Sequence, residues 1–120
     1  MDVRRILRVS EAVKEELIEI IGFELEDPRL LDVDVTGVQV SPDSRHASVR
    51  VALHGSEHER NQAIAALEHA SGYLRRELAS RLQMRRVPEL HFEPDKNPDG
   101  ESRVDLLLRR ARKTRGRDEN

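Results

Sequence analysis

The chain has 120 residues, of which 37% are hydrophobic and 37% charged, and this composition predicts a single small domain with a modest core. It contains no cysteine, which excludes disulfides, thiolate zinc sites and a cysteine nucleophile. No apolar run approaches the roughly 18 residues of a membrane span, and the acidic, periodic N-terminus is unlike a signal peptide, so we expect a cytoplasmic protein.

The net charge of −2 conceals a gradient along the chain. Residues 1–60 carry 8 basic and 13 acidic side chains, whereas residues 61–120 carry 13 basic and 10 acidic ones. The basic residues gather in two segments, 72–86 with five arginines against one glutamate and 103–117 with six arginines and a lysine against one aspartate. Such clusters either bind polyanions or keep a surface solvated, and composition alone does not separate the two.

The first element predicted along the chain is an amphipathic helix from Val3 to about Leu25. Its apolar residues follow helical spacing, with acidic residues between them: Val9, Val13, Leu17, Ile20 and Ile21. Pro28 ends this helix, because a proline disfavours helical geometry at the residue before it.

Two segments of alternating polarity follow and predict a β-hairpin. In "VDVTGVQVS" the alternation of valines slips by one residue at Gly37, which indicates a bulged strand. The segment "SPDSR" supplies turn residues, and "HASVRVALH" is a second strand with Ala47, Val49, Val51 and Leu53 on one face.

The next segments predict two helices and a third strand. Ser56 and Glu59 match the capping-box pattern that starts a helix. We expect Gly72 to interrupt this helix and a further helix to continue to about Met84. The segment "VPELHFEPD" then supplies a short edge strand, with Pro88 at its beginning.

The order helix, strand, strand, helix, helix, strand predicts an α/β fold of the α+β kind, with a three-stranded sheet covered on one face by helices. This order differs from those of an RNA-recognition motif and a double-stranded-RNA-binding domain, and it matches a type II KH domain. We expect one RNA-binding domain over residues 1–108 and a basic, disordered tail over residues 109–120.

The expected break at Gly72 raises an electrostatic question. A helix that restarts there exposes unpaired N–H groups with a partial positive charge, yet Arg75 and Arg76 follow at once. A phosphate at the helix start would resolve this conflict, because N–H and guanidinium groups would converge on it. The alternative is that Gly72 only permits a tight helix corner and that the arginines are solvated.

The same segment carries a family resemblance. "ALEHASGYLRRELASRLQMRRVPELHFEPD", together with "DPRL" at 27–30 and "RV" at 8–9, resembles the bacterial ribosome-binding factor A family over about residues 5–108. In that family a KH-like fold has Ala-x-Gly at the corner where KH domains usually carry GxxG, and Ala70-Ser71-Gly72 matches this position. The motif "VPEL" with Phe92 and Asp95 is a further match, as is the Asp-Pro-Arg at 27–29.

The resemblance implies a non-enzymatic, monomeric factor that binds the precursor small (30S) ribosomal subunit and its rRNA during late maturation and rRNA processing. Gly72 is expected to shape the approach of the RNA. The expected phosphate contacts are Arg75, Arg76, Arg81, Arg85 and Arg86, with a second patch formed by Arg4, Arg5 and Arg8 and a third by residues 109–117.

Two other interpretations of these residues compete with this one. The arginine clusters could dock an acidic protein partner instead of RNA. A metal site is not expected, because His46 and His54 lie at strand ends and His58 and His69 lie eleven residues apart on a helix. No cofactor or catalytic residue is predicted.

The aromatic residues decide the expected style of recognition. Phe23, Phe92 and Tyr73 are the whole set, and the two phenylalanines are spaced as core residues. Without a platform on which bases could stack, binding should depend on phosphate contacts and shape.

Overall fold

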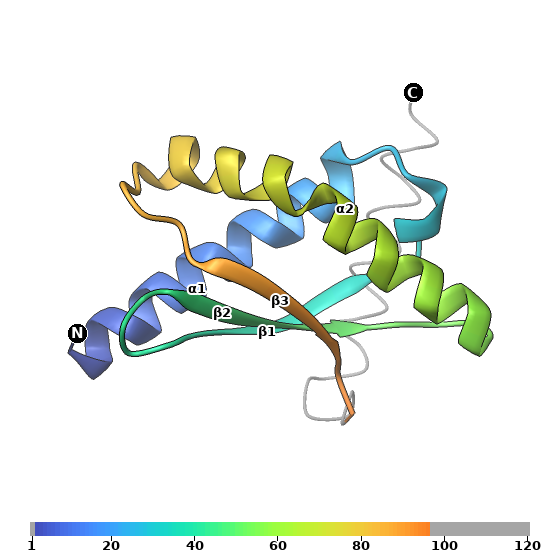
Figure 1. Cartoon of the computed structure of the whole chain (residues 1–120), viewed down its shortest axis with the longest axis horizontal. Coiled ribbons are helices and arrows are strands. Elements are labelled where there is room, and N and C mark those ends of the chain that lie inside the picture. Colours follow the sequence, from blue (N-terminus) through green and yellow to red (C-terminus); the bar gives the residue numbers. More distant parts are fainter. Residues whose placement is uncertain (1, 97–120) are drawn as a thin grey trace.

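Residues 2–96, which the computed structural model describes, form two layers, with helices covering one face of a three-stranded sheet (Figure 1). The elements are helix α1 (Val3–Glu19) with a π-helical turn (Ile20–Glu24), a 3-10 turn (Pro28–Leu30), strands β1 (Asp34–Val40) and β2 (His46–Ala52), helix α2 (Glu57–Leu82) and strand β3 (Glu89–Pro94). The predicted boundary at residue 108 and the predicted tail over 109–120 lie outside the described residues. Neither helix of the described part combines the length and the apolar character that crossing a bilayer requires.

The sheet has β2 in its centre, between β1 and β3. β1 pairs with β2 in antiparallel fashion through the hairpin, and β3 pairs with the other edge of β2 in parallel. The register of β1 shifts between Val35 and Gly37, which confirms the predicted bulge. The three-stranded α+β architecture is therefore confirmed.

The core lies between the helices and one face of this sheet. Ala47, Val49 and Val51 of β2 are completely buried, and the α2 residues Leu67, Leu74 and Leu78 are as well. The other face of β2 and β3 carries polar side chains, so the sheet is apolar on one side and polar on the other.

Helix α2 differs from the sequence prediction. It is one continuous helix through Ser71 and Gly72, although Figure 1 shows that it bends in its middle. The predicted order with two helices in this region is wrong, and the helix–turn–helix detail of a KH domain is not confirmed. A glycine in a helix costs only about 0.5–1 kcal/mol relative to alanine, and the buried leucines on both sides of Gly72 offset that cost.

Local sequence features mark both ends of α2, a capping box at its start and a left-handed residue at its end. The capping box is confirmed: the Ser56 hydroxyl accepts from the Glu59 amide at 3.1 Å, and the Glu59 carboxylate accepts from the Ser56 amide at 3.2 Å. At the other end Gln83 adopts a left-handed conformation with φ of 51°, which ends the helix and reverses the chain toward β3.

Candidate nucleic-acid interface

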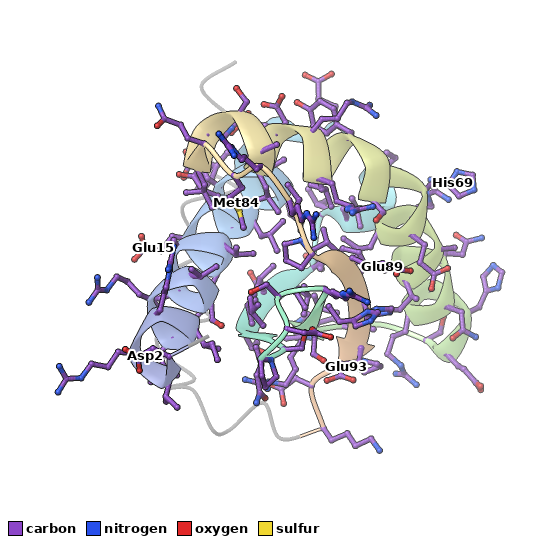
Figure 2. All side chains as sticks on the ribbon, turned by 60° about the vertical axis from the view of Figure 1, so that its left-hand side comes forward. Asp2, Glu15, His69, Met84, Glu89 and Glu93 are labelled. Atoms are coloured by element: carbon purple, nitrogen blue, oxygen red, sulfur yellow. The ribbon has the colours of Figure 1, made fainter. Side chains whose placement is uncertain are left out.

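An open groove of about 620 Å³ lies between the β1–β2 turn, the second half of α2 and the segment that leads into β3. Its charged lining consists of four arginines, a histidine and two carboxylates: Arg45, Arg75, Arg85, Arg86, His46, Asp43 and Glu89. Figure 2 looks onto this end of the molecule and shows several nitrogen-bearing side chains around the labelled Glu89. The groove thus collects basic residues from three separate parts of the chain.

Hydrogen bonds between these parts hold the walls of the groove in place. The guanidinium of Arg75 donates to the carbonyl oxygen of Val87 at 2.9 Å, which joins α2 to the segment before β3. The amide of Glu89 donates to the carbonyl oxygen of Arg45 at 2.8 Å, which joins β3 to the hairpin turn. These two hydrogen bonds connect the segments that carry the groove arginines to one another.

The hairpin turn is stabilised by its own short polar residues. Asp43 accepts hydrogen bonds from the Ser41 hydroxyl at 2.6 Å and from the Arg45 amide at 3.0 Å. The hydrogen bond from Ser41, followed by the one from the Arg45 amide, lowers the pKa of the Asp43 carboxyl. Asp43 is thus an ionised turn residue whose hydrogen bonds orient Arg45.

The charge balance of the groove favours anions. In the part of the chain that the structure describes, none of the four groove arginines lies within ion-pair distance of a carboxylate. Four guanidinium groups face a lining with only Asp43 and Glu89 as acids. Guanidinium groups bind phosphate oxygens through paired N–H donors, so a nucleic-acid backbone fits this lining chemically.

Gly72 and Arg76 extend this basic surface along α2. They lie three residues before and one residue after Arg75, which places all three on one exposed side of the helix. A Cβ atom at Gly72 would lie 3.4 Å from Nη1 of Arg76, so the guanidinium of Arg76 lies beside the glycine. Ala70 and Ser71, the other residues of the Ala-x-Gly match, which was expected to mark a kink between two helices, are half-buried.

The sequence predicted that a helix restarts at Gly72 and that its unpaired N–H groups bind a phosphate, and the structure does not have this helix start. The amides from Gly72 to Arg76 lie inside a continuous helix and are not the free N–H groups of a helix start. The expected phosphate corner with unpaired amides is therefore wrong. What the structure offers in its place is an exposed glycine beside the guanidinium of Arg76.

Arg81 stands apart from the other arginines of its cluster. Its guanidinium donates to Glu24 at 2.7 Å through Nη1 and again through Nη2, and also contacts Glu77 at 3.0 Å and Glu16 at 3.4 Å. The hydrogen bonds with Glu24 raise the pKa of Arg81, with smaller contributions from Glu77 and Glu16. Its guanidinium donors are bonded to three carboxylates, so this arginine connects α2 to α1 and to the π-helical turn.

The second predicted patch, Arg4, Arg5 and Arg8, lies in the first turns of α1 and is exposed. In Figure 1 the start of α1, the β1–β2 turn and the segment after α2 lie at the same end of the molecule. These three arginines do not line the groove. The third predicted patch, residues 109–117, lies outside the described residues.

The Asp-Pro-Arg motif forms a local clamp. Asp27 accepts from the Arg29 amide at 2.9 Å and pairs with the Arg29 guanidinium at 2.7 Å. These hydrogen bonds, the side-chain ones first, lower the pKa of Asp27. The motif starts the 3-10 turn before β1 and so has a structural role.

The aromatic side chains partly contradict the sequence prediction. Phe92 is half-buried against the core, but Phe23 is 45% exposed on the π-helical turn, so its assignment to the core is wrong. Tyr73 is 38% exposed beside Gly72. These residues come from different elements, and together they do not form a surface on which successive bases could stack.

Sequence reasoning missed Arg45, which joins the groove from the hairpin turn. Its only local signal was its position beside the turn residues of "SPDSR", where a basic side chain is expected to be solvated. Only the reversal of the chain after α2 places it across from Arg85 and Arg86.

The chain is similar to proteins of one known family over nearly its whole length. A family model described as "Ribosome-binding factor A" matches residues 5–108. A ribosome-binding factor A of Solibacter usitatus is 73% identical over 120 residues, covering 100% of this chain and 98% of the relative. One of Thermomicrobium roseum is 44% identical over 113 residues, covering 94% of this chain and 88% of the relative.

Two solved structures are also similar. The crystal structure of ribosome-binding factor A from Thermus thermophilus is 37% identical with a TM-score of 0.67, covering 74% of this chain and 94% of that one. A homology model of the Thermus thermophilus factor, fitted into the cryo-EM map of a 30S–RbfA complex, is 34% identical with a TM-score of 0.56. That comparison covers 77% of this chain and 92% of the fitted one.

Proposed function

Because the chain belongs to the ribosome-binding factor A family, we propose that it binds the precursor small ribosomal subunit and its rRNA during late maturation and rRNA processing. In this proposal it acts in the cytoplasm as a monomer and as a binding factor, not an enzyme. A homology model of a relative that is 34% identical has been fitted into the cryo-EM map of a 30S–RbfA complex, which supports the choice of partner.

The groove is the observation that carries this proposal. It presents Arg45, Arg75, Arg85 and Arg86 in one place, and none of them is neutralised by a carboxylate in the described part of the chain. Phosphate contacts supply most of the non-specific affinity of a protein for nucleic acid. We therefore assign the groove to the rRNA backbone, with the polar contacts fixing position more than sequence.

The other predicted residues take different places in the proposal. Gly72 and Arg76 extend the contact surface along α2, where the missing side chain of the glycine allows the RNA backbone to approach closely. Arg4, Arg5 and Arg8 form a separate patch at the same end of the molecule. Arg81 is left out, because its charge already balances carboxylates of α1, of α2 and of the π-helical turn.

A charge-removal experiment tests the groove. The variant Arg75→Ala/Arg85→Ala/Arg86→Ala should bind small subunits more weakly than the wild type in sedimentation and salt-titration assays. Affinity falls as salt rises, and each lost phosphate contact should make the slope of log affinity against log salt less negative by about 0.7–0.9. The matched control is Arg60→Ala/Lys96→Ala, which removes exposed cations that do not line the groove and should bind nearly as the wild type does.

Two results would contradict the assignment. If the folded groove variant keeps the affinity and the salt slope of the wild type, rRNA is held elsewhere, and the variant Arg4→Ala/Arg5→Ala/Arg8→Ala identifies the α1 patch as the site. If free rRNA fails to compete for the groove but an acidic protein does, the groove is a protein-docking site. Circular dichroism checks the folding of every variant before binding is measured.

A further inference from the structure

Three side chains with metal-ligand chemistry meet on the sheet face that points away from the helices. β2 and β3 run parallel with His46 opposite Glu89, and His91 lies two residues further along β3 on the same face. Nδ1 of His46 lies 3.0 Å from Nε2 of His91 and 4.0 Å from Oε2 of Glu89. The cluster is not visible in the sequence, because its three residues meet only through the pairing of two distant strands.

We propose that His46, Glu89 and His91 form a binding site for a divalent transition-metal ion of the Zn²⁺ class. One possible ligand atom from each residue lies within 4.8 Å of the others. Two nitrogens bound to tetrahedral zinc at about 2.0–2.1 Å lie about 3.3–3.4 Å apart, so the two imidazoles need to separate only slightly. Two imidazoles and a carboxylate are a donor set that holds zinc with a fourth position open to water.

The backbone beneath the cluster is held firmly, which favours a preformed site. Ala47 and Leu90, which follow His46 and Glu89 and point to the opposite face, are buried in the core. The Glu89 amide donates to the carbonyl oxygen of Arg45, which helps to fix the register of β3 against β2 at this point. The three ligand side chains are exposed, so an ion reaches them directly from solvent.

The cluster also has an ordinary explanation that the experiment must exclude. The two imidazoles can share one hydrogen bond on a solvated surface, with the N–H of one ring donating to the free nitrogen of the other. Since His46 and Glu89 also line the arginine groove, a bound cation would add positive charge at its rim. That consequence rests on the proposed function, whereas the test below uses the free protein and is independent of RNA.

The test is isothermal titration of the untagged full-length chain with ZnCl₂, together with absorption spectroscopy of Co²⁺ as a substitute ion. We expect one equivalent of Zn²⁺ to bind and an excess of Mg²⁺ to compete poorly, because magnesium prefers oxygen ligands. An outer hydrogen-bond partner of a metal ligand is worth about 10-fold to 100-fold in affinity, so loss of a ligand should cost at least that much. His46→Ala, Glu89→Gln and His91→Ala should each show this loss.

His69→Ala is the matched control, because it removes an exposed histidine of α2 that does not belong to the cluster and should leave zinc binding unchanged. NMR spectra of the histidine rings give a second readout, in which only the signals of His46 and His91 should shift on titration. Zinc binding that survives both His46→Ala and His91→Ala would overturn the proposal. The proposal would also be wrong if the wild type bound Zn²⁺ no more tightly than the double variant His46→Ala/His91→Ala.

Discussion

Arg81 of α2 and Glu24 of the turn after α1 form a two-point ion pair, although they lie 57 positions apart in the chain. Glu77 and Glu16 contact the same guanidinium at 3.0 and 3.4 Å. One cation therefore connects the C-terminal half of α2 to the end of α1. This contact explains why one arginine of a basic cluster serves the fold while its neighbours face solvent.

Arg81→Ala should lower the free energy of unfolding, because it leaves three carboxylates close together without their cation. Arg76→Ala, which removes an exposed arginine from the same helix, should change stability little. Urea denaturation measures both variants, and added salt should reduce the defect of Arg81→Ala by screening the repulsion. Equal denaturation midpoints for the two variants would show that the ion pairs contribute nothing to stability.

The Arg81 contact should also affect the dependence of stability on pH. The hydrogen bond from Arg81 lowers the pKa of Glu24 in the folded protein from its ordinary value of 4.5. A carboxyl with a lowered folded pKa stabilises the protein above its unfolded pKa, and this contribution disappears as the pH falls through the folded value. Glu24→Gln should therefore be less stable than the wild type at pH 7.

The difference between Glu24→Gln and the wild type should shrink as the pH falls below 4.5, which denaturation at a series of pH values measures. Asp27, Asp43 and Glu59 have lowered pKa values from their own hydrogen bonds, so the variant should keep part of its acid sensitivity. A constant difference between the two proteins from pH 7 to pH 3 would contradict the assigned cause.

Gly72→Ala should separate the stability of α2 from RNA binding. Gly72 lies in the helix without a positive φ, and a Cβ there meets only the flexible end of Arg76 at 3.4 Å. Alanine should therefore raise the free energy of unfolding by about 0.5–1 kcal/mol. If the rRNA backbone approaches this glycine, the more stable variant should bind small subunits more weakly.

Thermal denaturation and subunit sedimentation of the same Gly72→Ala sample measure the two effects. A variant that is more stable and binds with wild-type affinity would show that RNA does not approach the helix at this position. A variant that loses stability would show that the bend of α2 requires glycine.

Ser10→Ala should test the connection between α1 and the edge of the sheet. The Val40 amide donates to the hydroxyl of Ser10 at 3.0 Å, and Ser10 is buried. Without the hydroxyl this amide is left unpaired in the protein interior, which costs about 1–3 kcal/mol. Ser80→Ala on the exposed side of α2 should change stability by less than about 0.5 kcal/mol. A similar small change for Ser10→Ala would indicate that water replaces the hydroxyl.

Local features of this protein could be predicted from the sequence because the residues that cause them are neighbours in the chain. The first helix follows from the spacing of its apolar residues, the bulge from the phase slip at Gly37, and the start of α2 from the pair Ser56 and Glu59. The parallel edge strand after α2 was also expected as a strand, although its partner could not be named. Each of these signals depends on spacing of a few residues.

Tertiary packing decided what local spacing could not. Gly72 weakens a helix, but leucines on both sides of it are buried against the core, so α2 continues through the predicted break. The five arginines of residues 72–86 look alike in the sequence, yet Arg81 meets three carboxylates while Arg75, Arg85 and Arg86 line a groove with Arg45. The partner of a charged side chain depends on which distant segments the fold brings within a few ångströms, and the order of residues along the chain does not contain that distance.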